Sequence, residues 1–512
     1  MKRTNRKQSG AALIAFLLVF VTAASFALLK GINEVATQQH RDAQTVKALA
    51  EAKAALIGYA AGANIIPSGS CDSSSNCPRP GDLPCPDRDD DGVAGWGTPP
   101  SCGNASGSTG GCLGVPGLCS RLGRLPWKTL GLPDLRDGNG ERLWYAVSNN
   151  FKSNTRTSCG SSGAGGCLNS DSLGTLTAHA TNGAIIHNGT NPDEWNPSGA
   201  VAVLLAPGEV LRRQGASSDQ DRTCAGGSCD PNGKCITTPP TDTPKCNPQN
   251  YLDTAGEDNA AFGDNTLDGF IQGGVIDTNG EVIVNDRLLA ITYQDLMPLL
   301  ERRVAGEVLA CLRDYSALLG NNARYPWAAN VAWPDPPILS DARDLRFGRV
   351  PDEPFSNTKT DIGGPTSDTW LPDKCKPPKL ATCTVPVQCK ITSRSSSKTW
   401  WLNWKEHVFY AVAEAYQPAT GSPSPCGLPN SCLTVNSPSP TSDRRAVVMV
   451  AGKKLAAALN QVRDNAAQKG IPTNYLEGEN ADDPPGTYDN SYTSGPATAT
   501  FNDITCNNGN CL

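Results

Sequence analysis

The feature that most constrains this 512-residue chain is a set of short phrases that occurs twice in the same order. Each set begins with a stretch whose apolar residues recur at helical spacing and continues with short apolar, β-prone runs. One match would be chance, but six in unchanged order indicate the duplication of a whole domain. The pairs are residues 46–62 with 303–320, 123–132 with 323–333, 140–151 with 405–416, 199–211 with 444–455, 247–253 with 471–477, and 282–290 with 498–506.

The order of these segments predicts an α+β fold that is built twice. In each copy a helix comes first and β-prone runs follow, as in helices packed on an antiparallel sheet. We therefore expect two tandem helix-plus-sheet domains with disulfide-tied loops, at residues 67–290 and 291–512. Charged residues interrupt the apolar face of the second helix, so we expect that helix to pack on its own sheet.

One segment of the sequence is suited to cross a bilayer. Residues 11–29 are apolar and uncharged, and as a helix they span roughly the ~30 Å hydrocarbon core. The residues before them include Lys2, Arg3, Arg6 and Lys7 but no acid. Because such a basic flank stays in the cytoplasm, we expect the rest of the chain outside it.

The cysteine content agrees with this placement. Twenty cysteines in one chain are typical of an oxidising compartment such as the periplasm or the cell surface. Many lie close together and predict local disulfides, although spacing alone does not fix the connectivity. These close pairs are Cys71/Cys77, Cys159/Cys167, Cys224/Cys229, Cys235/Cys246, Cys426/Cys432 and Cys506/Cys511.

The composition argues against several classes of function. No Cys-x-x-Cys pair occurs and only four histidines are present, which disfavours a zinc site or attached haem. The 44 basic and 50 acidic residues give a net charge of −6 without a basic cluster beyond the N-terminus, which disfavours nucleic-acid binding. No Gly-x-Ser-x-Gly elbow accompanies the histidines, so we expect no enzymatic activity.

The N-terminal residues KQSGAALIAF (7–16) resemble the class III signal of type IV pilins and type II secretion pseudopilins. In that family a prepilin peptidase cleaves after the glycine and methylates the new N-terminus, which implies cleavage between Gly10 and Ala11. The resemblance implies a basic leader at residues 1–10 and a transmembrane and stem helix at residues 11–66. Residues 31–61 contain no proline and many good helix formers, which favours the continuous helix.

The same resemblance implies a location and a set of partners. The chain is expected to cross the inner membrane of a Gram-negative bacterium once, with its bulk in the periplasm or at the cell surface. Its expected partners are other pilins or pseudopilins, the prepilin peptidase and an inner-membrane assembly platform. Phrases such as LPCPDRDDDG and ERLWYAV also look like those of large prepilin-type proteins, a similarity that supplies no activity.

One residue departs from the family pattern. Most pilins carry a glutamate at the fifth mature position, where it pairs with the N-terminal amine of a neighbouring subunit, whereas this chain has Ala15. The family tolerates that loss in minor subunits, notably at the tip of the type II secretion pseudopilus. The resemblance therefore favours a minor or tip subunit over a repeating one.

An acidic motif predicts a calcium loop. Asp87, Asp89 and Asp91 alternate and Gly92 follows, which supplies three carboxylates and the sharp turn that calcium loops need. An EF-hand requires a glutamate at the twelfth position, where this chain has Thr98, so the motif is not a complete EF-hand. The alternative is an acidic, solvated turn.

Three tryptophans form a second candidate site. Trp400, Trp401 and Trp404 are predicted as an exposed patch whose aromatic faces would suit a glycan or a partner protein.

Two other interpretations of the whole chain remain open. The N-terminal segment could be an ordinary signal peptide or an uncleaved anchor. The chain would then be a membrane-anchored periplasmic or surface binding protein, or an adhesin, that does not polymerise. An extracellular hydrolase is a more distant alternative.

Overall fold

The computed structural model describes the backbone of residues 9–62 and the side chains from residue 35 onward in a defined set of segments. These segments are 35–62, 79–95, 122–148, 151–152, 168–189, 199–212, 219–222, 248–252, 259–260, 269–317, 323–332, 339, 341–351, 400–419, 422–426, 431–436, 440–481, 488–507 and 510–511. All structural statements below concern these residues.

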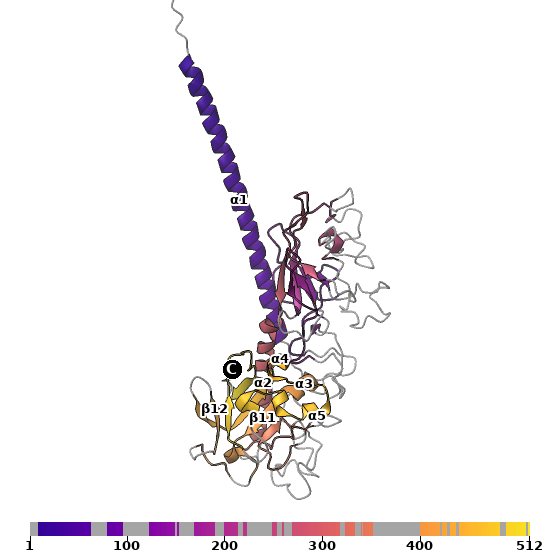
Figure 1. The fold of residues 1–512 in the computed structure, drawn as a ribbon, viewed down its shortest axis with the longest axis vertical. Coiled ribbons are helices and arrows are strands. Elements are labelled where there is room, and N and C mark those ends of the chain that lie inside the picture. The colour runs from indigo at the N-terminus through magenta and orange to yellow at the C-terminus, as the bar shows by residue number, and fades with distance from the viewer. Residues whose placement is uncertain are drawn as a thin grey trace, which may run out of the picture.

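The N-terminal helix α1 runs without interruption from Ser9 to Gly62, over 54 residues. Its second half lacks proline and is rich in good helix formers. Of its described side chains, those buried against the rest of the chain lie in its C-terminal part, and the helix projects from the head as a long rod (Figure 1). Its buried residues recur every three or four positions and are Thr45, Ala48, Leu49, Ala52, Leu56 and Ala60.

The membrane segment predicted at residues 11–29 lies in the part of α1 whose side chains are outside the described residues. Among the described residues, no helix is long and apolar enough to cross a membrane. The structure thus contains the predicted helix but does not itself support a transmembrane stem.

The first half of the chain forms a four-stranded antiparallel sheet in the order β1-β2-β5-β9. In its register Tyr145 lies opposite Leu204, and Leu204 lies opposite Leu289. The end of α1 packs on β5 and β9. The strands are β1 (Leu122–Arg124), β2 (Trp144–Val147), β5 (Ala202–Ala206) and β9 (Arg287–Ile291).

The second half repeats this arrangement. Its sheet has the order β10-β11-β14-β16-β17, and Tyr410 lies opposite Val448, which lies opposite Cys506. Helix α2 (Tyr293–Ser316) packs on β14 and β16, as the sequence predicts. The strands are β10 (Phe347–Arg349), β11 (Val408–Val412), β14 (Ala446–Val450), β16 (Ile504–Asn507) and β17 (Asn510–Cys511).

A smaller three-stranded sheet accompanies each main sheet, in the order β4-β3-β6 in the first half and β13-β12-β15 in the second. In both, the central strand pairs antiparallel on one side and parallel on the other. The strands are β3 (Ala178–His179), β4 (Ile185–His187), β6 (Phe270–Ile271), β12 (Leu433–Asn436), β13 (Thr441–Arg444) and β15 (Ser491–Thr493). The remaining β-strands form the hairpin β7 (Val275–Ile276) and β8 (Val282–Val284), and the short α-helices are α3 (Trp400–Trp404), α4 (Ala456–Leu459) and α5 (Ala466–Lys469).

Helix α2 joins the two halves. Thr292 caps its N-terminus in a capping box with Asp295, and Asp295 also accepts a hydrogen bond from Lys53 of α1 at 2.8 Å. Its buried face is continuous with one hydrophobic core that contains residues of both halves. Its central buried positions follow a spacing of four residues: Leu296, Leu300, Val304, Val308 and Leu312. The coarse prediction of an α+β fold with small antiparallel sheets is therefore confirmed.

The structure corrects one pairing of the repeated phrases. The sequence matches Pro126–Trp127 with Pro326–Trp327, but the hydroxyl of Tyr145 donates to the carbonyl of Pro84, and the hydroxyl of Tyr410 donates to that of Pro326. Pro326 therefore corresponds to Pro84, because the two tyrosines occupy the same place on β2 and β11. The predicted match was a chance likeness of two Pro-Trp pairs.

The true counterpart of β1 is β10, where LGRLP (122–126) corresponds to FGRVP (347–351). In both halves the glycine of this phrase lies against a neighbouring carbonyl: a Cβ on Gly123 would meet the carbonyl oxygen of Asp87, and one on Gly348 would meet that of Ala329. Asp87 pairs antiparallel with Arg124, and Ala329 pairs in the same way with Arg349. Both halves therefore need glycine at this edge of the sheet.

One of the predicted local disulfides, Cys426–Cys432, is present. Cys85, Cys311 and Cys506 are also disulfide-bonded, and no described cysteine is free. The predicted pairs Cys71/Cys77, Cys159/Cys167, Cys224/Cys229 and Cys235/Cys246 lie outside the described residues.

We predict that Gly348→Ala lowers the free energy of unfolding by about 2 kcal/mol, because the added methyl group forces the segment that contains Ala329 away from β10. Gly306→Ala is the matched control, since that glycine lies inside α2 with open space around it. There alanine should raise the stability by about 0.5–1 kcal/mol. Chemical denaturation of the oxidised protein measures both, and equal effects would contradict the predicted backbone contact.

Candidate functional site

The predicted calcium loop folds as a compact turn beside the edge of the first sheet. The backbone of Asp87 exchanges two hydrogen bonds with that of Arg124 in β1, at 2.9 and 2.7 Å. The chain then turns sharply, with positive φ at Asp90 (59°) and Gly92 (84°). A Cβ on Gly92 would meet the indole of Trp127 at 2.6 Å, so glycine is needed there for space as well as for its backbone angle.

The turn gathers the three predicted ligands. Carboxylate oxygens of Asp87, Asp89 and Asp91 all lie within 4.8 Å of one another. The carboxylate of Asp87 accepts from the backbone N–H of Asp89 at 3.2 Å and from that of Gly92 at 2.7 Å. These bonds fix the loop while each carboxylate keeps further lone pairs, which is the donor chemistry that Ca²⁺ prefers.

The electrostatics of this loop disfavour three ionised carboxylates side by side. Burial raises the pKa of Asp87 well above its ordinary value, and the charge of Asp90 raises it further. The nearby arginine pairs with Asp90, whose carboxylate lies 2.9 Å from Arg142. The residues thus fit an oxygen-ligated cation, while Thr98 at the twelfth loop position lies outside the described residues.

The predicted tryptophan patch is wrong. Trp400, Trp401 and Trp404 form the short helix α3 and are at most 2% exposed. Their positions place them on adjoining faces of one turn and a half, and all three belong to the core that both halves share. They are therefore packing residues and offer no surface to a ligand.

The predicted processing positions lie at the start of α1. Gly10, Ala11 and Ala15 are helical in backbone, and their side chains are outside the described residues. The structure therefore places them on the rod that projects from the head (Figure 1).

An acidic residue that the sequence did not single out links the two halves. Asp171 of the first half accepts from Arg463 at 2.7 Å and from the backbone N–H of Lys454 at 3.0 Å, and lies 3.2 Å from His407. Although burial alone raises the pKa of Asp171, Arg463 and His407 bring it below its ordinary value. Burial lowers the pKa of His407. No local motif signals this contact, because its partners lie more than 200 residues away.

A second feature missed by the sequence is a pair of arginine–aromatic stacks, one in each half. In the first, the guanidinium of Arg124 lies 4.1 Å from the centre of the Trp144 ring and 3.9 Å from that of Tyr251. Its counterpart in the second half is formed by Arg349, Phe409 and Tyr475, at 4.3 and 4.5 Å. The arginines and tyrosines are at most 3% exposed. The stacks attach residues 250–252 and 474–476, which are Asn-Tyr-Leu in both halves, to the sheets, so they are structural.

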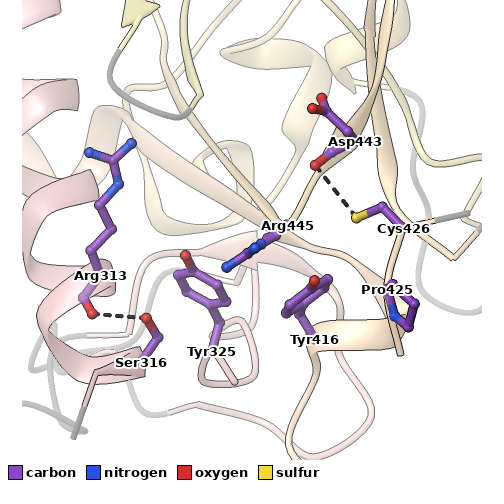
Figure 2. A pocket seen from close by; sticks show the side chains of 8 residues that line it. All are labelled: Arg313, Ser316, Tyr325, Tyr416, Pro425, Cys426, Asp443 and Arg445. Carbon is purple, nitrogen blue, oxygen red and sulfur yellow. Dashed lines mark hydrogen bonds between the residues drawn. The ribbon is translucent and has the colours of Figure 1, made fainter. Parts of the chain in front are cut away.

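The second half also contains a polar pocket of about 520 Å³ that no sequence motif indicates. Figure 2 shows it between the C-terminal end of α2, the disulfide loop and the strand β13. Its lining residues are Arg313, Ser316, Tyr325, Tyr416, Pro425, Cys426, Asp443 and Arg445.

Comparison with protein-family models, with curated proteins and with solved structures gives no match for this chain.

The buried carboxyl of Glu301 gives a prediction for the junction of the halves. Glu301 lies on α2, 3% exposed, and accepts from the hydroxyl of Tyr293 at 3.2 Å. Burial raises its pKa to about 7 from 4.5. The folded protein therefore binds this proton more tightly than the unfolded chain. The stability that this bound proton contributes is fully present below pH 4.5 and is lost as the pH rises through 7.

We predict that Glu301→Gln removes about 3 kcal/mol of this pH-dependent loss, since the amide keeps the acceptor and cannot ionise. The measurement is the unfolding free energy from pH 4 to pH 8.5 for both proteins. Glu307→Gln, on the same helix, is the control and should follow the wild type. Parallel pH profiles for wild type and Glu301→Gln would contradict the prediction.

Proposed function

We propose that this chain is a non-enzymatic minor subunit of a type IV pilus or type II secretion pseudopilus, with α1 as its assembly stem. The observation that carries the proposal is the form of α1. It is one 54-residue helix whose last part packs on the first sheet while the rest projects from the head. A rod of this kind offers side chains to neighbouring rods in a bundle, as a stem in a fibre requires.

The sequence of the stem supports a processed, membrane-inserted subunit. The uncharged run at 11–29 suits the inner membrane, and the basic residues before it suit a cytoplasmic leader. Prepilin peptidase would cut between Gly10 and Ala11. The subunit would then pack with other pilins or pseudopilins on an inner-membrane assembly platform, with its head in the periplasm or at the cell surface.

The arrangement of the head favours a position at the tip. The second half lies beyond the C-terminal end of α1 instead of beside it (Figure 1). In a fibre whose stems run parallel, that space belongs to the head of the next subunit. Ala15, in place of the usual glutamate, also removes the charge that a repeating subunit offers its neighbour. A subunit that primes or caps the fibre is free of both constraints.

The proposal predicts a specific mature N-terminus. Mass spectrometry of the protein from cells with prepilin peptidase should find N-methylated Ala11 as the first residue, and cells without the peptidase should retain Met1 to Gly10. Substitution of Gly10 by a larger residue should block the cut, while a change at Ser9 should not.

Other termini would support other functions. A start at Met1 in both strains would identify a signal-anchored binding protein, and a start near Ser25 would identify a secreted one. Either result would overturn the assembly-stem proposal.

A second proposal is that the loop with Asp87, Asp89 and Asp91 binds calcium as a structural ion. It is supported by the mutual approach of the three carboxylates within 4.8 Å. The carbonyl of Val93, at the seventh loop position, would be a further ligand. The ion would hold this turn against the edge of the first sheet.

We predict that calcium at about ten times its dissociation constant stabilises the wild type by about 1.4 kcal/mol. Asp89→Asn should abolish this effect, whereas Asp344→Asn, which changes an exposed residue in the other half, should preserve it. Thermal unfolding in EGTA, magnesium and calcium measures the effect. No calcium-specific shift in the wild type would leave the loop as an acidic turn that holds no ion.

A further inference from the structure

The polar pocket of the second half has a counterpart in the first half, and two pairs of hydrogen bonds establish the correspondence. The backbone N–H of Leu83 donates to the carbonyl of Phe151 at 2.7 Å, and that of Tyr325 donates to Tyr416 at 2.9 Å. Tyr325 and Tyr416 therefore occupy the places of Leu83 and Phe151. The side chains of Leu83 and Phe151 are both fully buried.

The third position of the pocket follows in the same way. The N–H of Ser148 donates to the carbonyl of Val201 at 2.8 Å, and that of Ala413 donates to Arg445 at 2.9 Å. Val201 is fully buried, whereas Arg445 is exposed. An apolar surface in the first half has thus become a polar, charged one in the second.

The reason for the apolar surface is visible in the first half. Leu83 belongs to the core shared by the halves, and next to it Gly81 lies so close to α2 that a Cβ would meet Leu300 at 2.7 Å. In the first half, α2 therefore covers the surface that corresponds to the pocket. At the corresponding position of the second half, the described residues leave a cavity of about 520 Å³, a volume within the range of small-molecule sites.

The charges of the pocket define what it can hold. No ion pair joins Arg313 or Arg445 to a carboxylate among the residues described by the structure. The one carboxylate of the lining, Asp443, lies 3.4 Å from Arg444, and Figure 2 shows it directed away from Arg445. The guanidinium of Arg445 instead lies over the ring of Tyr416, at 4.9 Å.

The hydroxyl of Tyr325 points toward the same space as the guanidinium of Arg445 (Figure 2). A guanidinium binds a carboxylate through two parallel N–H bonds, and a phenol adds one more donor. The rest of the lining offers hydroxyl groups and few apolar surfaces, which suits a ligand with many hydroxyls.

We propose that this pocket binds an acidic sugar, with the carboxylate on Arg445 and the sugar hydroxyls on Tyr325 and its neighbours. The pocket lies in the half farthest from the N-terminal end of α1 (Figure 1). The proposal goes beyond the assembly function and does not depend on it, since none of these residues belongs to the stem.

The test is ligand-observed NMR on the full chain in detergent micelles, with methyl β-D-glucuronide as the probe. We expect a dissociation constant on the order of 1 mM, as for a single small ligand, and at least tenfold weaker binding of methyl β-D-glucoside, which lacks the carboxylate. Arg445→Gln should weaken the glucuronide about tenfold, because it removes a charged donor. Arg343→Gln, which changes an exposed arginine of the same half outside the lining, is the matched control and should bind like the wild type.

The remaining outcomes also decide the matter. Tyr325→Phe removes only a hydroxyl from a buried ring, so it tests the pocket even if Arg445→Gln fails to fold, and weaker glucuronide binding is expected. Equal binding of glucuronide and glucoside, or unchanged binding in Tyr325→Phe, would overturn the proposal. Binding of acetate or N-acetylaspartate as tight as that of glucuronide would also overturn it, because the pocket would then recognise any carboxylate or an acidic peptide.

Discussion

The packing of α2 against the end of α1 is the contact on which the rest of the structure depends. Lys53 bridges the helices by donating to Asp295, and Arg303 donates to the backbone carbonyl of Ala61. These polar bonds flank an apolar seam that merges the cores of both halves. Burial of apolar surface stabilises a fold by about 25 cal/mol per Å². The shared core therefore fixes the second half against the first when the chain folds.

A comparison of the two halves shows which contacts are common to both and which belong to only one. Both keep an arginine stacked on aromatic rings, a buried asparagine bonded to a buried aspartate, and a glycine against the edge of the sheet. They differ where one half has no neighbour to pack on. Asp87 corresponds to Ala329, so the acidic loop belongs to the first half alone, and Leu83 corresponds to Tyr325, so the pocket belongs to the second.

The two long helices α1 and α2 and the central strands could be predicted from the sequence, because each produces a periodic or continuous apolar signal within a short window. The apolar runs at 202–206 and 446–450 became central strands, buried at every position, as continuous apolar runs suggest. The acidic loop was also predictable, since its three aspartates lie within five residues. Sequence reasoning failed at Trp400, Trp401 and Trp404, where a short helix turned apparent surface residues into core.

What the sequence determined by itself is thus local: a long helix, two sets of strands, a close cysteine pair and an acidic turn. The tertiary structure alone decided which proline phrases correspond, that Asp171 is held by Arg463 across nearly 300 positions, and that Tyr325 and Arg445 share a pocket. The physical reason is that a local pattern shows which face of an element is apolar but not which element will cover it. That choice is made when the chain closes its long loops and the buried faces compete for partners.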